Sequence, residues 1–437
     1  MNLPRTADIA IVGAGAAGLA AAISAGAAAQ GSGARIILLE SARKPGAKIL
    51  VSGGGRCNVT NARVAADDFS GGPRPIIRKV LRAFDEKHTL AWFASLGVPL
   101  KLEPSGKYFP TSNQARTVLD ALLRRVQEVG VHLVSGVRVT GIRRTRDGFV
   151  LPVTQSSHAS RSTRTVLQTR RLIVATGGLA LPKSGSDGAG LAMMRHLGHT
   201  IIPLAPALTP LVLRKGTDLG GRFAEFSGLS FDARLRLYLE IPESQTRRLL
   251  VELNGPLLFT HFGISGPAPM NLSRHWLRAR LEDPDKRLAV YLGVAALPTV
   301  EAADRWLLEQ GISHPRKKIP AVLCGFVPER FARATAAGIS GEIPLSQANR
   351  AQRRDLAQMM TMLELPVIGT RGYAHAEATA GGVDLRELDV RTMASRLVDG
   401  LFLCGEILDV DGRIGGFNFQ WAWSTGFLAG RGAVASL

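Results

Sequence analysis

The stretch that decides the fold is DIAIVGAGAAG, residues 8–18. Its mostly apolar first half predicts a buried strand that ends at Gly13, and the Ala-rich sequence that follows predicts a helix. Gly13, Gly15 and Gly18 match the GxGxxG pattern, in which the glycines serve a tight turn, a close backbone approach to a pyrophosphate, and helix-on-strand packing, in that order. The N-terminus of the helix offers free N–H groups to an anion.

The next predicted strand, residues 35–40, strengthens this interpretation. It ends in Glu40, 22 residues after Gly18, where a carboxylate can accept hydrogen bonds from the ribose hydroxyls of an adenosine. Glu40 would repel a 2′-phosphate, so NADP fits this position poorly. The alternative is a parallel βαβ unit that binds no nucleotide.

Two later segments have the same strand-then-glycine character. Residues 172–178, LIVATGG, predict a buried strand that enters a glycine turn. Residues 400–406, GLFLCGE, predict another strand, and Asp409 and the run GGFNFQ at 415–420 follow it. In this order the segments resemble FAD enzymes of the two-dinucleotide-binding-domain type. That resemblance implies that Glu406, where most such enzymes have Asp, holds the ribityl chain.

Four longer motifs support a narrower resemblance. These are residues 48–61, KILVSGGGRCNVTN; 259–267, FTHFGISGP; 381–383, GGV; and 415–423, GGFNFQWAW. They are similar to the bacterial BaiN/RdsA flavoprotein family, which includes aminoacetone-oxidase-like members, and the similarity extends from about residue 7 to 433. It implies FAD held jointly by the N-terminal and C-terminal segments, with a pair of subdomains inserted between them.

The fingerprint and the resemblance together give the candidate cofactor-binding residues. Among them, Arg43 and Lys48 could neutralise the pyrophosphate or the reduced flavin, although a solvated role is an equal alternative. The full set is Gly13, Gly15, Ala16, Ala17, Gly18, Glu40, Arg43, Lys48, Gly53, Gly54, Val139, Thr176, Gly177, Gly405, Glu406, Asp409, Gly415, Gly416, Phe417, Asn418 and Gln420.

The expected fold class is α/β, a Rossmann-like FAD-binding domain of the two-dinucleotide-binding-domain flavoprotein type. Because both chain ends supply flavin contacts, residues 1–198 and 370–437 are expected to form one discontinuous domain. Strand-like patterns predict an inserted β-rich subdomain at 199–295, and helical patterns predict a small helical subdomain at 296–369. Residues 153–165 have loop composition and are expected to extend a hairpin.

The charge of the chain is strongly positive and regional. The 437 residues carry a formal net charge of +19, and residues 124–171 hold ten arginines against Glu128 and Asp147. Bound FAD has only about two negative charges, whereas a polyanion would use such a surface. The charge therefore favours RNA binding. The alternatives are general solubility, an Arg-rich composition inherited from the genome, and an anionic membrane surface.

Among the activities that the resemblance implies, the charge favours reduction of a uridine in 23S rRNA to dihydrouridine, with NADH or NADPH as a transient reductant. Reduction would add a hydride at C6 and a proton at C5. Cys57 is the first candidate proton donor, with packing as its alternative, and His261 is the second. A small-molecule flavoenzyme (aminoacetone-type oxidase or enone/bile-acid reductase) and a non-catalytic, flavin-bound RNA-binding protein remain open.

Other function classes receive no support from the sequence. The three cysteines form no CxxC pair and the nine histidines form no HExxH cluster, so no metal site is expected. The N-terminus lacks the pattern of a secretory signal, and the uncharged residues 9–34 are mostly Ala and Gly, which gain little from lipid. We expect a cytoplasmic protein without stable membrane association.

Overall fold

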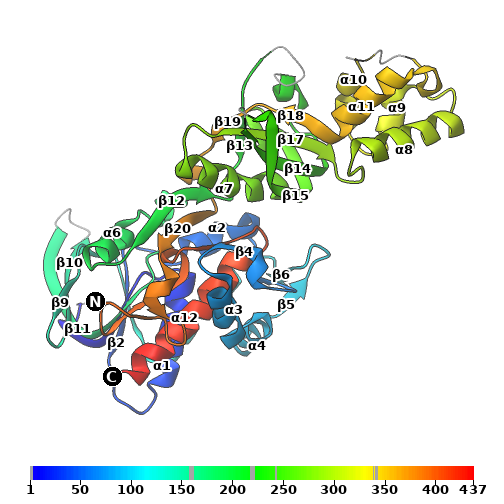
Figure 1. Cartoon of the computed structure of the whole chain (residues 1–437). Helices are drawn as coiled ribbons and strands as arrows, with labels where there is room; N and C mark the ends of the chain where they lie inside the picture. Colours follow the sequence, from blue (N-terminus) through cyan, green and yellow to red (C-terminus); the bar gives the residue numbers. More distant parts are fainter. Residues whose placement is uncertain (1–2, 157–161, 217–221, 242–243, 338, 340–342) are drawn as a thin grey trace. The chain divides into compact units, whose positions relative to one another are not determined.

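The computed structural model describes residues 3–156, 162–216, 222–241, 244–337, 339 and 343–437. The chain divides into two compact units. The first comprises Met1–Ala205 with Ala378–Leu437, and the second is Pro206–Glu377. Figure 1 shows the elements of each unit.

The first unit is built on a parallel sheet in the strand order β23-β11-β1-β2-β7. The strands are β1 (Thr6–Val12), β2 (Ile36–Glu40), β7 (His132–Ser135), β11 (Ser162–Val174) and β23 (Leu401–Leu403). All five residues of β2 are buried, as expected for a strand covered on both faces. The strands predicted within residues 8–12, 35–40, 172–178 and 400–406 all belong to this sheet.

Short antiparallel strands extend the sheet beyond β23 and from the first half of β11. Beyond β23 lie β22 (Ala394–Ser395) and β21 (Leu388–Asp389). On β11, a meander is formed by β10 (Gly148–Ser156), β9 (Arg143–Thr145) and β8 (Val137–Val139). The expected hairpin is therefore present as β10 and β11, and most of residues 153–165 is strand rather than loop. Residues 157–161, including Arg161, lie outside the described part of the chain.

The remaining elements of this unit are helices and small sheets. The helices are α1 (Ala16–Ala28), α2 (Ala47–Gly55), α3 (Arg74–Ala83), α4 (Glu86–Ser95), α5 (Ala115–Glu128), α6 (Ala189–His196) and α12 (Phe417–Ala435). The small sheets comprise β3 (Thr60–Asn61) with β6 (Lys107–Pro110) and β5 (Leu100–Leu102), β4 (Phe69–Gly71) with β24 (Val410–Gly412), and β12 (Ile201–Ala207) with β20 (Ala378–Val383).

Helix α12 packs directly against α1, so the last helix of the chain lies beside the first (Figure 1). Glycines make this approach possible. A Cβ atom at Gly426 would lie 2.4 Å from the Ala17 carbonyl oxygen, and one at Gly430 would lie 2.4 Å from that of Ala21. The contact ties the C-terminal segment to the helix that follows the GxGxxG turn.

The second unit contains a seven-stranded sheet in the order β18-β17-β14-β15-β16-β13-β19. Its strands are β13 (Leu211–Leu213), β14 (Ser230–Ile241), β15 (Thr246–Thr260), β16 (Gly263–Ser265), β17 (Arg287–Val294), β18 (Leu363–Leu365) and β19 (Val367–Thr370). Its helices are α7 (Pro267–Glu282), α8 (Val300–Ser313), α9 (Ile319–Leu323), α10 (Glu329–Ala337) and α11 (Arg350–Met362).

The unit boundaries differ from the expected ones, and the pairing of two sets of strands explains the difference. Strand β12 pairs with β20, which carries the first unit past residue 198 to Ala205. Strand β19 pairs with β13, which keeps residues up to Glu377 in the second unit. The stretches expected as separate β-rich and helical subdomains, 199–295 and 296–369, contribute to one buried cluster that includes Leu235 and Leu356. We therefore describe them as one unit.

None of the helices in the described part of the chain combines the length and hydropathy that crossing a bilayer requires.

Gly430→Ala should destabilise the first unit by about 1–3 kcal/mol, because the new methyl group would overlap the Ala21 carbonyl oxygen. Thermal unfolding followed by circular dichroism measures the effect. The control is Gly311→Ala in α8, where a Cβ atom would meet its nearest neighbours at an ordinary 3.7 Å. That variant should gain about 0.5–1 kcal/mol from helix propensity. An equal change in thermal stability in the two variants would contradict the close contact between α1 and α12.

Candidate cofactor site

Four predicted segments meet at one edge of the parallel sheet. Because β1, β2, β11 and β23 are parallel, their carboxyl ends lie on the same side. The turn that begins at Gly13 follows β1, Glu40 ends β2, Thr176 lies just beyond β11, and Gly405 lies just beyond β23. This edge is where open α/β sheets bind their ligands.

The GxGxxG turn has the geometry that its spacing predicts. Gly13 has a φ of 101°, and a Cβ atom there would lie 2.6 Å from the Ala175 carbonyl oxygen. A Cβ atom at Gly18 would lie only 1.8 Å from the Gly13 oxygen, whereas nothing described lies within 4 Å of one at Gly15. No side chain in the described structure caps α1, which Ala16 and Ala17 open. An anion can therefore approach Gly15 and the helix N-terminus.

Glu40 is held beneath this turn by backbone amides. Its Oε2 accepts a hydrogen bond from Ala14 N at 2.8 Å, and its Oε1 accepts one from Ala42 N at 2.8 Å. The side chain is buried, with 9% of the residue exposed. The carboxylate is thus fixed in position before any ribose binds. Arg43 is exposed nearby in sequence, and Val139 is buried in β8.

Lys48, Glu406 and Thr379 form a polar cluster that joins distant segments. Lys48 Nζ lies 2.7 Å from Glu406 Oε2, and the two side chains are 24% and 20% exposed. Thr379 donates to Glu406 Oε1 through its hydroxyl at 2.8 Å and its backbone amide at 3.0 Å. Sequence analysis singled out Lys48 and Glu406 but not as partners, and it missed Thr379, which lies two residues before the Gly381-Gly382 motif.

Thr379 also fixes the loop that follows the ATGG turn. Its hydroxyl oxygen accepts hydrogen bonds from Leu179 N at 2.8 Å and Ala180 N at 3.0 Å. A Cβ atom at Gly178 would lie 2.4 Å from that hydroxyl. Gly177 has a φ of 74°, which a glycine adopts without strain. One threonine therefore couples the turns after β11 and β23.

The C-terminal GGFNFQ segment is anchored by asparagines before it becomes helix α12. Asn61 Nδ2 donates to the Gly415 carbonyl at 3.0 Å, and the amide of Asn418 pairs with both backbone groups of Gly412 at 2.8 and 3.1 Å. Gly416 has a φ of 92°, and a Cβ atom there would lie 2.7 Å from the Thr60 oxygen. No side chain in the described structure caps the N-terminus of α12. Phe417 within this segment is buried, and Asp409, which precedes it in the chain, is buried as well.

Gln420 has a different role from the expected cofactor contact. It is fully buried, and its Oε1 accepts hydrogen bonds from the Thr60 hydroxyl at 2.7 Å and the Thr89 hydroxyl at 2.9 Å. Its Nε2 donates to the Phe84 carbonyl at 3.0 Å and to the Ser424 hydroxyl at 3.2 Å. These four bonds use both donors and two acceptor positions of the amide. We therefore assign Gln420 to packing α12 against β3 and α4.

The glycine-rich loop at the end of α2 exposes Gly53 and Gly54 but buries Cys57. Gly53 and Gly54 have φ values of 56° and 68°, and nothing described lies within 4 Å of a Cβ atom at Gly54. Cys57 has a φ of 61° and is 0% exposed. Burial raises the pKa of its thiol to about 12, because a thiolate loses hydration there. We infer that Cys57 packs behind the loop and does not touch substrate.

His261, the second candidate proton donor, is exposed and lies in the turn between β15 and β16 of the second unit. Its ring contacts that of Phe262 edge-on at 5.0 Å, and the Arg371 guanidinium lies 4.4 Å above the Phe262 ring. The other candidate residues lie in the first unit.

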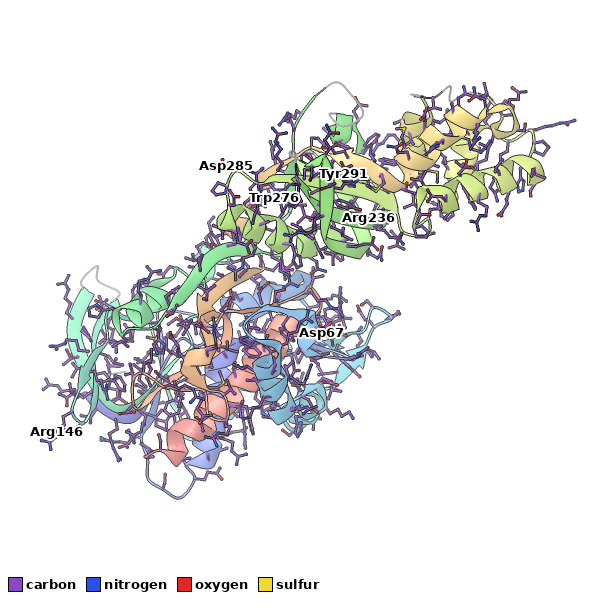
Figure 2. All side chains as sticks on the ribbon, viewed as in Figure 1. Asp67, Arg146, Arg236, Trp276, Asp285 and Tyr291 are labelled. Atoms are coloured by element: carbon purple, nitrogen blue, oxygen red, sulfur yellow. The ribbon has the colours of Figure 1, made fainter. Side chains whose placement is uncertain are left out.

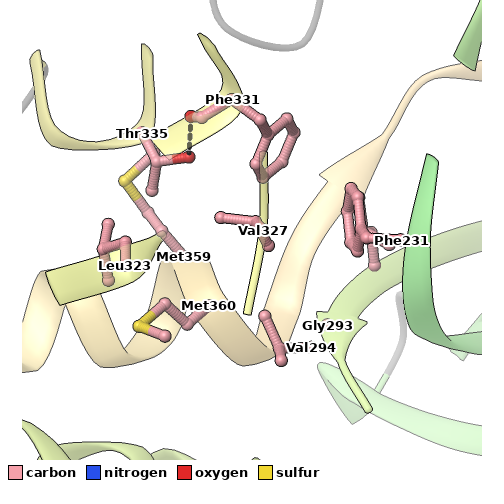
Figure 3. A pocket seen from close by; sticks show the side chains of 10 residues that line it. Phe231, Gly293, Val294, Leu323, Val327, Phe331, Thr335, Met359 and Met360 are labelled. Atoms are coloured by element: carbon pink, nitrogen blue, oxygen red, sulfur yellow. Dashed lines mark hydrogen bonds between the residues drawn. The ribbon is translucent and has the colours of Figure 1, made fainter. Parts of the chain in front are cut away.

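Two further features outside this edge are structural. His199 Nδ1 lies 2.7 Å from Glu387 Oε2 and its Nε2 lies 2.9 Å from the Ser395 hydroxyl, an arrangement like a hydrolase triad, but the His199 side chain is 0% exposed. The pocket in Figure 3 is lined mainly by apolar side chains of the second unit, including Phe231 and Met360. Its Thr335 hydroxyl already donates to the Phe331 carbonyl at 2.9 Å.

The edge of the parallel sheet fits a dinucleotide with a flavin. Open space at Gly15 and an uncapped helix suit a pyrophosphate, and Glu40 and Glu406 are fixed carboxylates at the two ends of the edge. The Thr176 hydroxyl is buried and has no hydrogen-bond partner among the described residues. A buried polar atom without a partner is costly in a native structure unless a ligand or water supplies one. The residues present therefore fit FAD.

Comparison with known proteins gives matches over almost the whole chain. The model of the HI0933-like protein Rossmann domain matches residues 7–432. A 3-dehydro-bile acid delta(4,6)-reductase of Clostridium scindens is 35% identical over 98% of this chain and 98% of its own. The ribosomal RNA dihydrouridine synthases of Escherichia coli and Haemophilus influenzae are 30% and 28% identical, over 98% and 95% of this chain and 98% and 96% of theirs.

The burial of two thiols leads to a labelling prediction. In the native protein, iodoacetamide should modify exposed Cys324 and leave Cys57 and Cys404 unmodified from pH 6 to 10, since burial raises the pKa of both buried thiols to about 12. Mass spectrometry should find one modified cysteine before unfolding and three after it. Cys324→Ser provides the control and should show none before unfolding. Native labelling of Cys57 would return it to the candidates for substrate contact.

Glu406→Ala should reduce the flavin content of the purified protein at least tenfold, because it removes the partner of Lys48 and the acceptor of the Thr379 hydroxyl. Glu406→Gln keeps an acceptor for Thr379 and should lose less. The ratio of visible to ultraviolet absorbance measures bound flavin. The control is Glu128→Ala, which removes an exposed glutamate paired with surface arginines on α5. Full flavin content in Glu406→Ala would contradict the assigned contact.

Proposed function

The chain belongs to the HI0933-like family of Rossmann-domain proteins, and from this premise we propose that it reduces a uridine of 23S rRNA to dihydrouridine with NADH or NADPH as electron donor. Family membership confirms the predicted α/β, Rossmann-like FAD-binding fold and the prediction of an FAD-dependent oxidoreductase. The choice of rRNA as substrate and of NAD(P)H as reductant is our proposal.

The observation that carries the choice of substrate is the large positive charge on a chain similar in full length to two rRNA dihydrouridine synthases. FAD neutralises only about two of the 19 excess positive charges. In the first unit, Arg143, Arg146 and Arg164 are exposed. A polyanionic substrate accounts for this charge better than a small neutral molecule does.

The geometry at the sheet edge supports the proposed cofactor-binding roles. We propose that Gly15 and the N-terminus of α1 hold the pyrophosphate, Glu40 the ribose, and Glu406 the ribityl chain. Lys48 then keeps the Glu406 carboxylate paired and oriented. When bound, FAD supplies hydride transfer to the substrate. The free N–H groups that open α12 would stabilise negative charge on the cofactor.

Reduction of uracil adds a hydride at C6 and a proton at C5, so a donor must reach C5. Cys57 has no exposed surface, and we therefore place the proton donor elsewhere. His261, the second candidate donor from the sequence, is exposed and stays a prediction.

The 35% identity with the bile-acid reductase favours a second candidate, a reductase of small conjugated ketones. The two chemistries are related, because uracil and an enone both present a carbon–carbon double bond conjugated to a carbonyl group. The same hydride and proton additions would serve either substrate. The substrates differ in charge, and the charge of this chain favours RNA.

The test is nucleoside mass spectrometry of 23S rRNA from the source organism with and without this gene. One dihydrouridine should disappear in the deletion strain and return when wild-type protein is supplied, but not when Glu406→Ala is supplied. A 23S rRNA unchanged by deletion would overturn the proposed substrate. Anaerobic NADH oxidation by the purified protein with a steroid enone, at a rate indifferent to added rRNA, would instead support the second candidate.

A further inference from the structure

The meander formed by β8, β9, β10 and β11 arranges arginines in rows across the sheet. The register places Arg138 opposite Thr154 and Thr154 opposite Arg164, so these three residues form one row. Arg143 lies opposite Val150, which lies opposite Gln168, in a second row. Residues directly opposite each other on neighbouring strands project from the same face of a sheet.

This face points to solvent. The alternate residues of β10 and β11, such as Phe149, Leu151 and Leu167, are at most 2% exposed and project from the opposite face. Val166 is 43% exposed. We call the outward side the arginine face, and it consists of Arg138, Arg143, Val150, Pro152, Thr154, Arg164, Val166, Gln168 and Arg170.

The arginines of this face are only partly neutralised by the protein itself. Arg138 pairs with Asp187, and Arg170 lies 3.8 Å from Asp8. Among the described residues, no carboxylate lies within 4 Å of Arg143 or Arg164. Arg146, in the turn after β9, extends the positive charge beyond the face and projects from the edge of the meander in Figure 2.

Arg138 and Arg164 are two strands apart, about 10 Å at the usual strand spacing. An anionic chain that lies across the strands could contact both. Val166 is the one large hydrophobic side chain of the described face that is strongly exposed, so the face offers little to an apolar partner.

Arg164, in the arginine face, lies far along β11 from the cofactor edge. Arg164 lies ten residues before Val174, where β11 ends at the cofactor edge. At about 3.3 Å per residue this corresponds to roughly 33 Å along the strand. FAD and a steroid-sized substrate bound at that edge are too short to contact Arg164, whereas a folded RNA is long enough.

We propose that the arginine face docks the phosphate backbone of rRNA, remote from the base that is reduced at the cofactor edge. This inference rests on the proposed rRNA function and assigns that function a binding surface. Arg143 and Arg164 are the residues expected to contact phosphates, because they have no carboxylate partner in the described structure. Arginine suits this role because its guanidinium binds phosphate oxygens in a bidentate manner.

The test compares the double variant Arg143→Gln/Arg164→Gln with a matched control in the same unit. The control is Arg386→Gln/Arg391→Gln, which removes the same charge from arginines that are 70% and 72% exposed and paired with Asp384 and Asp389. Affinity for transcribed 23S rRNA is measured by filter binding from 50 to 200 mM KCl. Bound flavin in each variant reports that the first unit is folded.

We expect the arginine-face variant to bind RNA at least tenfold more weakly at 100 mM KCl. The slope of log K against log salt should fall by about two, roughly one for each phosphate that the protein no longer neutralises. The control should bind within twofold of wild type with an unchanged slope. Equal weakening in both variants, or wild-type binding by the arginine-face variant, would overturn the proposal.

Other outcomes separate this proposal from the function on which it rests. If deletion of the gene removes a dihydrouridine while the arginine-face variant binds rRNA like wild type, the face is wrong and the function stands. If wild type does not bind 23S rRNA and deletion leaves the dihydrouridines unchanged, both fail. If the variant loses only binding to phosphatidylserine vesicles, the face is a membrane surface and the proposal is overturned.

Discussion

The contact between α1 and α12 is the constraint on which the cofactor edge depends. The two helices can approach each other this closely only because Gly426 and Gly430 have no side chains where the Ala17 and Ala21 carbonyl oxygens lie. The last helix is thereby fixed to the helix that follows the GxGxxG turn. The segment before α12, from Gly405 to Gly416, is consequently held at the same edge as the first 40 residues.

Polar contacts near these two helices fix the positions of the Glu40 and Glu406 carboxylates. Glu40 is held by backbone amides of its own nucleotide unit, so local structure suffices to orient it. Glu406 depends on Thr379, 27 residues before it, and on Lys48, 358 residues before it in the N-terminal segment. The first carboxylate is therefore a property of the βαβ unit, and the second is a property of the assembled domain.

The first unit also separates two kinds of positive charge. Lys48 is half-buried and paired at the cofactor edge, whereas Arg143 in β9 and Arg164 near the start of β11 are exposed. The first kind orients a carboxylate, and the second is available to an external anion. Strand β11 runs from the proposed RNA-binding face to the proposed cofactor edge, so one rigid element would position both a base and the RNA that carries it.

The sequence by itself determined the βαβ unit, the segments that form the parallel strands, and the family. These features are visible in the sequence because turns with positive φ and strands buried on both faces restrict residue type locally. Gly13, Gly18 and Glu40 lie where their spacing predicts. The roles of Gln420, Cys57 and Thr379, and the unit boundaries at Ala205 and Glu377, were decided only by tertiary structure. Burial, hydrogen-bond partners and strand pairing in these cases come from segments up to hundreds of residues apart, and no local pattern encodes which of them will meet.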